Sequence, residues 1–182
     1  MSDIGVLRNI ESEELELMLK WRNTPEIRMN MYTQHEISLQ EHFAWWKRTS
    51  LREDQKYFMY TYNNLPLGIV AFNNIDKINS NSSWAFYAAP NAPRGSGSRM
   101  ELLALDFGFH ELKLHKLHCE VLATNMQVVK MHQKFGFQIE GILRQQHKTK
   151  SDFIDVYRLG ILSTEWLENR SALYEKISNF TR

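Results

Sequence analysis

The chain has 182 residues, of which 43% are hydrophobic, and this is enough for one domain with a sizeable core. Its 22 basic and 21 acidic residues leave a net charge of +1. The chain therefore lacks the large basic excess typical of nucleic-acid-binding proteins, and this argues against that class. Cys119 is the only cysteine, so a disulfide framework is excluded and a reducing compartment is indicated. The sequence shows neither a membrane-spanning run nor a secretion signal. We therefore expect a cytoplasmic protein with no membrane or nucleic-acid partner.

The chain begins with a predicted strand at residues 4–10 and a predicted helix at residues 13–23. Ser12 is in position to cap this helix, and Pro25 ends it. A second helix is predicted over residues 38–48, because Ser38 followed by Glu41 fits the capping-box pattern. In this helix the spacing of Phe43 and Trp46 favours core packing, whereas Trp45 is the better candidate for a ring that faces a substrate.

Three strands follow, at residues 56–64, 67–75 and 82–89, and the turn residues of "NNLP" predict that the first two form a hairpin. After a glycine-rich loop, apolar residues at helical spacing predict a buried helix over residues 100–109.

Residues 116–123 alternate as a strand, and Thr124 with Gln127 predicts a capping box for the helix 126–135. A long hairpin at residues 137–162 and a terminal helix at 163–177 complete the chain. This mixed order of elements indicates an α+β or mixed α/β domain.

The loop "RGSGSRM", residues 94–100, has the composition of an anion site. Gly95 and Gly97 allow close approach of a ligand to backbone N–H groups at the start of a helix, where the helix dipole favours negative charge. Additional donors come from the hydroxyls and guanidinium groups of Ser96, Ser98, Arg94 and Arg99. The loop lacks the Gly-Lys-Ser/Thr of a P-loop and the third glycine of a dinucleotide fingerprint. It is therefore either a different phosphate cradle or an ordinary helix-entry loop.

The chain resembles the GNAT superfamily of acetyl-coenzyme A-dependent N-acetyltransferases in the order and spacing of five segments. These are the strand before the loop, the loop, the buried helix, the strand 116–125 and the helix ending in "KFGF". The resemblance covers residues 4–162. Arg94 and Gly97 match the family loop Arg/Gln-x-x-Gly-x-Gly/Ala, whereas Arg99 replaces its final small residue. The resemblance implies a central mixed, largely antiparallel twisted sheet flanked by helices, in a domain of residues 1–165 with a helical extension at 166–182.

The segments "LKWRNTPEI", "EHFAWW", "KYFMYTY", "FNNI" and "AFYAAPN" resemble more closely the N-acetyltransferases of pseudaminic acid biosynthesis. Those enzymes acetylate the 4-amino group of a UDP-linked 4-amino-4,6-dideoxy sugar on the route to flagellin glycosylation. Two alternatives stay open: a ribosomal-protein-type N-terminal alanine acetyltransferase, and a non-catalytic acyl-CoA-binding module.

The resemblance implies that acetyl-CoA is the co-substrate. Its pyrophosphate would lie on the loop 94–99, and its pantetheine arm would pair with the backbone of Tyr87, Ala88 and Ala89 and with Asn125. An extended amide-containing chain binds in this way by adding to the edge of a strand.

For catalysis, the resemblance implies that His132, four residues before Gly136, protonates the departing thiolate, with Tyr87 as the alternative. The competing interpretation of His132 is a polar residue on an exposed helix face.

The residues implied for acceptor binding are Arg22, Asn23, Glu41, His42 and Trp45. Arg22 could instead form a surface ion pair, and Glu41 could serve the capping box. His115 and His118 have the spacing of metal ligands, but they would lie on opposite faces of a strand, so we expect no metal. The aromatic-rich strands could bury the surface of a homodimer.

Overall fold

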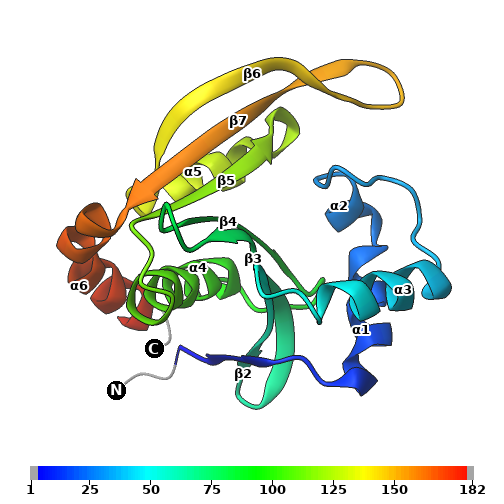
Figure 1. Ribbon diagram of the computed structural model, residues 1–182, viewed down its shortest axis with the longest axis horizontal. Coiled ribbons are helices and arrows are strands. Elements are labelled where there is room, and N and C mark those ends of the chain that lie inside the picture. The colour runs from blue at the N-terminus through cyan, green and yellow to red at the C-terminus, as the bar shows by residue number, and fades with distance from the viewer. Residues whose placement is uncertain (1–3, 180–182) are drawn as a thin grey trace.

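The computed structural model describes residues 4–179, and its central feature is a twisted seven-stranded sheet with the order β1-β2-β3-β4-β5-β7-β6 (Figure 1). The strands are β1 (Val6–Asn9), β2 (Gln55–Tyr62), β3 (Leu65–Asp76), β4 (Asn81–Ala88), β5 (Lys116–Leu122), β6 (Gln138–Lys148) and β7 (Phe153–Leu162). The α-helices are α1 (Leu15–Arg22), α2 (Pro25–Arg28), α3 (Leu39–Thr49), α4 (Ser96–Asp106), α5 (Met126–Lys134) and α6 (Ser163–Asn179). A π-helical turn follows α4 at Phe107–Glu111, and short 3₁₀ turns precede α1 and α5 at Ser12–Glu14 and Ala123–Asn125.

The predicted hairpins are confirmed. β2 pairs antiparallel with β3, and β6 with β7. Asn63 and Asn64 connect the first pair with φ values of 50° and 60°, which is the left-handed conformation that a tight hairpin turn requires and that asparagine tolerates well. The sheet is therefore mixed and largely antiparallel, as the family resemblance implies.

The pair β4 and β5 is the only parallel one among the described strands, and it is short. Asn81–Ser83 pair with Lys116–His118, and beyond these residues the two strands diverge, although β4 continues to Ala88 and β5 to Leu122. On its other side β4 remains paired with β3 as far as Ala88. One edge of the second half of β4 therefore lies open inside the sheet.

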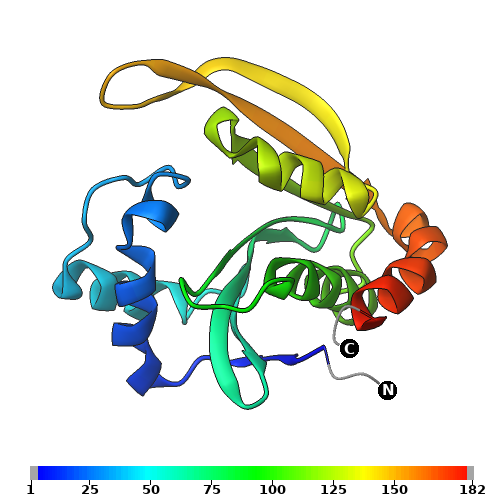
Figure 2. The same ribbon diagram turned by 180° about the vertical axis from the view of Figure 1, so that it is seen from behind.

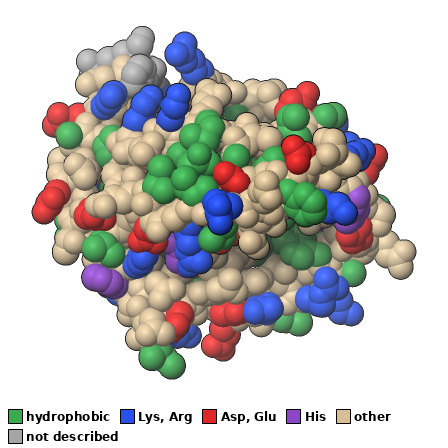
Figure 3. Space-filling view, turned by 90° about the horizontal axis from the view of Figure 1, so that it is seen from above, with side chains coloured by type: hydrophobic (Ala, Val, Ile, Leu, Met, Phe, Trp, Pro, Cys, Tyr) green, Lys and Arg blue, Asp and Glu red, His purple; other side chains and the backbone are tan. Residues whose placement is uncertain are grey.

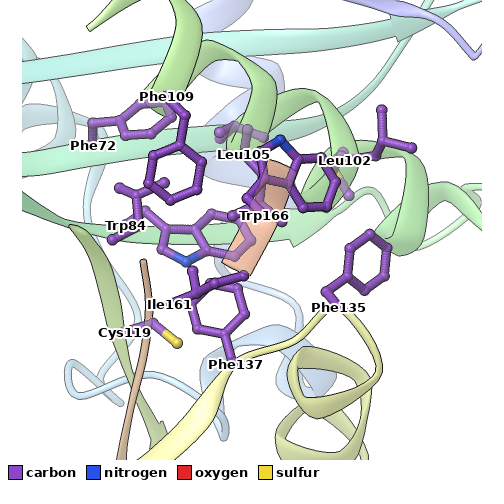
Figure 4. Packing of buried hydrophobic residues seen from close by; sticks show 14 of the residues in the cluster. Phe72, Trp84, Leu102, Leu105, Phe109, Cys119, Phe135, Phe137, Ile161 and Trp166 are labelled. Atoms are coloured by element: carbon purple, nitrogen blue, oxygen red, sulfur yellow. The ribbon is translucent and has the colours of Figure 1, made fainter. Parts of the chain in front are cut away.

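Apolar side chains pack on both faces of the sheet, because alternate residues of a strand point in opposite directions. On one face α4, α5 and α6 cover the main core, which includes Phe72, Trp84 and Trp166 (Figures 2 and 4). On the other face α1 and α3 cover a smaller cluster that includes Met18 and Ile69. β4 contributes to both clusters, with Trp84 and Tyr87 respectively.

Three details of the predicted helix ends and packing are wrong. Glu11, and not Ser12, occupies the cap position before the first helical turn, where it forms a capping box with Glu14. Asn125 is the N-cap of α5 without a side-chain cap bond, so Thr124 forms no capping box. Phe43 is 41% exposed instead of buried. Only in the first case does a neighbouring residue, Glu11, supply the predicted cap.

The division expected at residue 165 falls within the first turn of α6. Trp166 is 0% exposed in the main core, and its Nε1 donates to Oδ1 of Asp106 at 3.0 Å. Arg170 forms an ion pair with the same carboxylate at 2.7 Å. α6 is thus attached to the core through α4.

Within residues 4–179, no helix is long and apolar enough to cross a membrane. Lysine and arginine side chains are interspersed with aspartate and glutamate on the face shown in Figure 3.

We predict that Trp166→Ala lowers the free energy of unfolding by about 3–5 kcal/mol, because it leaves a large cavity in the core and removes one of the two partners of Asp106. Leu167→Ala is the matched control: its side chain is 62% exposed, so its effect should stay within about 0.5 kcal/mol. Urea denaturation measures both. Equal losses in the two variants would mean that α6 is not anchored through Trp166.

Candidate active site

Two cavities meet at the second half of β4. The first lies between the diverging strands β4 and β5 and is lined by Glu26, Ile27, Asn30, Met31, Trp84–Ala88, Cys119–Val121, Asn125, Val128 and His132. The second lies below α1 and α3 and is lined by Met18, Arg22, Met31, Thr33, Ile37, Glu41, His42, Trp45, Arg48, Tyr57, Ile69, Ala71, Asn73 and Ala85–Tyr87. Both include Met31, Ala85, Phe86 and Tyr87. We refer to them as the cleft and, from the prediction that Arg22 and His42 bind an acceptor, the acceptor pocket; two ligands bound in them would meet at Ala85–Tyr87.

The loop before α4 presents free backbone donors. Gly95 is the N-cap of α4 with φ 92°, a conformation that glycine adopts without strain. The N–H groups of Ser96 and Arg99 bind the carbonyls of Pro93 and Gly95, both at 3.1 Å. Across the described chain, the N–H groups of Gly97 and Ser98 have no such partner outside the helix. These two donors, at the positive end of the helix dipole, fit a phosphate group.

The expectations for Ser96 and Arg99 are corrected by the structure. The Ser96 hydroxyl donates to the Pro93 carbonyl at 2.8 Å and is buried. The Arg99 guanidinium lies 4.4 Å from the centre of the Tyr62 ring, with the residue only 5% exposed. Both side chains therefore serve the packing of α4. The side chains left for a phosphate are those of Arg94, which is exposed, and Ser98.

At the open edge of β4, Ala88 has the backbone orientation needed for an extended ligand, whereas the alternation of the antiparallel ladder turns the backbone of Tyr87 toward Ile69 of β3, contrary to expectation. Ala89 differs, because its N–H donates to Leu67 at 2.8 Å and its carbonyl accepts from Ala92 at 2.9 Å. The expectation that Ala89 pairs with a ligand is therefore wrong. Asn125 lines the same cleft from the start of α5, and its side chain makes no cap bond.

His132 and Glu101 form a buried pair beside the cleft. Nδ1 of His132 on α5 lies 2.7 Å from Oε1 of Glu101 on α4, and the two side chains are 3% and 0% exposed. This burial excludes the interpretation of His132 as a residue on an exposed helix face.

The pair retains a proton at neutral pH. Burial by itself lowers the pKa of His132, but the Glu101 carboxylate and a hydrogen bond with the Cys119 thiol outweigh it and raise the pKa to about 10. Burial raises the pKa of Glu101, against the effect of His132. The pKa values of both groups are raised, so the pair holds the proton between Nδ1 and Oε1 more firmly than either group would alone in water.

The acceptor pocket brings together Arg22, Glu41, His42 and Trp45, four of the five residues for which an acceptor-binding role is predicted. Nη2 of Arg22 donates to the Thr33 carbonyl at 2.9 Å, whereas its Nη1 and the Nε2 of His42 are buried without a partner among the described residues. Burial lowers the pKa of His42, against a hydrogen bond with the backbone of Leu15, so the ring is neutral at pH 7. Arg22 and His42 thus offer this pocket a cationic donor and a neutral imidazole.

Asn23 does not belong to this pocket, contrary to expectation. Its amide group donates to the carbonyl of Ile37 at 2.8 Å and accepts from the N–H of Ile37 at 2.9 Å. Asn23 therefore fixes the segment between α2 and α3. Glu41 lines the pocket, but its carboxylate lies 3.0 Å from Nε2 of His35. Only the Ser38 half of the predicted capping box is present, with Oγ accepting from the Glu41 N–H at 3.2 Å.

Tyr87 stands between the two cavities. Burial raises the pKa of its phenol above the usual value, against the effect of Arg22, so the hydroxyl keeps its proton and remains a donor.

Sequence reasoning missed Glu101, Arg48 and Tyr57. Glu101 carries a usable signal: it precedes the buried Ala104 and Leu105 by three and four residues, and so places a carboxylate on the apolar face of a helix.

The described residues contain no group of three or more His, Cys, Asp or Glu side chains that could hold a metal ion. A phosphate site at a helix start, an open strand edge and a second pocket that joins it define a group-transfer enzyme with an extended, phosphate-bearing donor.

The comparisons with known proteins agree with this class. Residues 6–138 match the model of the acetyltransferase (GNAT) domain. Acetyltransferase PseH of Campylobacter jejuni strain 81-176 is 30% identical over 130 residues, which are 71% of this chain and 80% of the relative. The chain therefore belongs to the GNAT acetyltransferase family, and its co-substrate is acetyl-CoA.

Two further relatives carry a different name. Spermidine N(1)-acetyltransferase of Vibrio cholerae is 32% identical over 107 residues, 58% of this chain and 61% of the relative. The crystal structure of spermidine N-acetyltransferase from Vibrio cholerae in complex with CoA and spermine matches 89% of this chain and 97% of its own, with a TM-score of 0.83 and 24% identity. This structural likeness shows the shared fold.

We predict that Arg94→Ala weakens the binding of coenzyme A by about 1–3 kcal/mol, the range for a hydrogen bond to a charged group. Lys176→Ala on the exposed side of α6 is the control for a lost surface charge and should leave the affinity unchanged. Calorimetry at two salt concentrations measures the effect. Equal affinity of Arg94→Ala and the wild type would mean that the backbone alone holds the phosphates.

Proposed function

We propose that the chain transfers the acetyl group of acetyl-CoA to the 4-amino group of a UDP-linked 4-amino-4,6-dideoxy sugar. The observation that carries this proposal is the unpartnered, buried Nη1 of Arg22 in the acceptor pocket. A buried cationic donor without a partner is costly in an apolar site. A diphosphate oxygen is the ligand group that would satisfy it best, because guanidinium forms charge-assisted hydrogen bonds with phosphate.

The rest of the acceptor pocket supports the same ligand. Arg48 adds a second cation to the lining. The Trp45 ring stacks on His42, with the ring centres 5.2 Å apart and the planes at 27°, and Tyr57 meets Trp45 edge-on at 5.2 Å. Aromatic faces of this kind bind nucleobases by stacking. Nε2 of His42 is free to accept a hydrogen bond from the sugar.

A polyamine acceptor fits this pocket poorly. Spermidine carries several positive charges, whereas the pocket lining holds Arg22 and Arg48 against the single carboxylate of Glu41. That carboxylate already faces His35. Like charges at close range disfavour binding. The similarity to acetyltransferase PseH agrees with the resemblance to the pseudaminic acid enzymes and favours the nucleotide sugar.

In the proposed reaction the neutral 4-amino group attacks the thioester carbonyl at Ala85–Tyr87, where cleft and pocket meet. The new C–N bond forms, the C–S bond breaks, and the amine gives its extra proton to water. Open N–H groups of β4 are placed to stabilise the charge that develops on the carbonyl oxygen. His132 supplies the proton that converts the departing thiolate into a thiol, and Tyr87 is the alternative donor.

The test of the substrate is thiol release with three acceptors: the UDP-linked 4-amino sugar, spermidine and a peptide with N-terminal alanine. We expect turnover with the sugar. Preference for the peptide would favour protein N-terminal acetylation. Binding of acetyl-CoA without turnover of any of the three would favour a coenzyme-binding module.

We predict that Arg22→Gln raises KM for the nucleotide sugar by about 10- to 100-fold, because it removes a charge-assisted contact worth about 1.5–3 kcal/mol. KM for acetyl-CoA should not change. Arg22→Lys keeps the charge without the planar fork and should give an intermediate value. Arg52→Gln is the control, since Arg52 pairs with Asp54 outside the pocket. An unaltered sugar KM in Arg22→Gln would contradict the placement of the diphosphate.

His132→Phe is predicted to lower kcat far more than it weakens coenzyme A binding, because an aromatic ring stays at this position while the proton donor is lost. General acid catalysis contributes about 10²–10⁴-fold. Steady-state kinetics and calorimetry measure the two effects. Unchanged turnover would remove His132 from the mechanism and leave Tyr87 as the candidate.

A further inference from the structure

Glu101 is a fully buried carboxylate in the otherwise apolar second turn of α4. The residues next to it, Met100 and Leu102, are both 0% exposed. A buried charge of this kind costs several kcal/mol unless a partner compensates it. Its partner is the Nδ1 of His132 at 2.7 Å, and its second oxygen, Oε2, has none in the described structure.

The surroundings of His132 leave it few other polar neighbours. Trp84 and Phe86 of β4 pack against the ring at centre distances of 5.4 and 6.1 Å, and Phe137 packs against it at 5.1 Å. The titratable groups that face the ring are Glu101 from α4 and Cys119 from β5. Since Nδ1 is held by Glu101, Nε2 is the nitrogen left toward Cys119 and the cleft that both residues line.

We propose that Glu101 is a positioning residue for catalysis: by holding Nδ1 of His132, it fixes the ring so that Nε2 carries its proton toward the thioester sulfur. This proposal rests on the proposed role of His132 as the acid. The proton on Nε2 passes to the sulfur when the C–S bond breaks, and the neutral ring left behind stays bound to Glu101. A proton from water restores the acid before the next cycle.

The same contact joins the two helices that hold the coenzyme. α4 begins at the phosphate loop, and α5 begins at Asn125 in the cleft. The pair therefore fixes the acid relative to both ends of the bound donor. Without the carboxylate, burial would lower the pKa of His132 below that of a free imidazole, about 6.5. The ring would then be neutral at pH 7 and above.

The test is the pH profile of kcat for Glu101→Gln, a substitution that keeps the size and removes the charge. A general acid is protonated and active below its pKa, and above its pKa it loses the proton and the activity. Wild-type kcat should hold through pH 9 and fall near pH 10, whereas in Glu101→Gln the fall should move to about pH 6.5 or lower. At pH 8 this is a loss on the order of 30-fold, with KM for acetyl-CoA unchanged. Glu111→Gln, an exposed glutamate after the same helix, should keep the wild-type profile.

A uniform fall of kcat at every pH, without a displaced limb, would overturn the proposal, because it is the signature of a structural role alone. A second measurement needs neither the variant's stability nor an acceptor: NMR titration of the wild-type histidine rings, with His132→Phe identifying the signal among the seven histidines. We expect the His132 ring to stay protonated through pH 9. A ring that titrates near pH 6.5 would also overturn the proposal. Failure of the sugar to react would instead overturn the proposed acceptor and leave this titration unaffected.

Discussion

The separation of β4 from β5 is the constraint on which the site depends. A parallel pair that continued to Ala88 would satisfy the backbone of β4 and leave no room for a ligand inside the sheet. The pairing ends at Ser83 and His118, and β3 keeps the other edge of β4 in place. The sheet therefore remains one unit while it exposes a strand edge in its middle. Such an edge can accept an extended amide chain as it would accept another strand.

The two faces of β4 carry side chains toward different cavities. Trp84 and Phe86 point to the face covered by α4 and α5, where the His132–Glu101 pair lies. Tyr87 points to the face covered by α1 and α3, where Arg22 and His42 line the acceptor pocket. The alternation of side chains along one strand thus places His132 and the pocket of Arg22 and His42 on opposite faces of β4.

Several buried polar side chains lie at the two cavities or in contact with a residue that lines them. His132 lines the cleft and contacts Glu101 behind it, and His42 and Arg22 line the acceptor pocket. Desolvation makes each of them costly, and the compensation is incomplete for Arg22 and His42, which leave nitrogens unpartnered. By contrast, the half-buried Asp106 is engaged by both Trp166 and Arg170.

The sequence by itself determined the elements that local chemistry controls. Alternating apolar residues defined β2 and β3, the asparagine pair defined their turn, and the glycines of the 94–100 loop defined where a helix start could meet phosphate. It also pointed to Arg22, His42 and Trp45. Tertiary structure alone decided which side chains of these segments were free. Ser96, Arg99, Ala89 and Asn23 had the right chemistry, but each is engaged with the protein itself, and Glu101 was recognisable as a partner of His132 only once α4 and α5 lay side by side. The physical reason is that a hydrogen-bonding group has few partners to make, and only the folded chain shows whether residues distant in sequence have already supplied them.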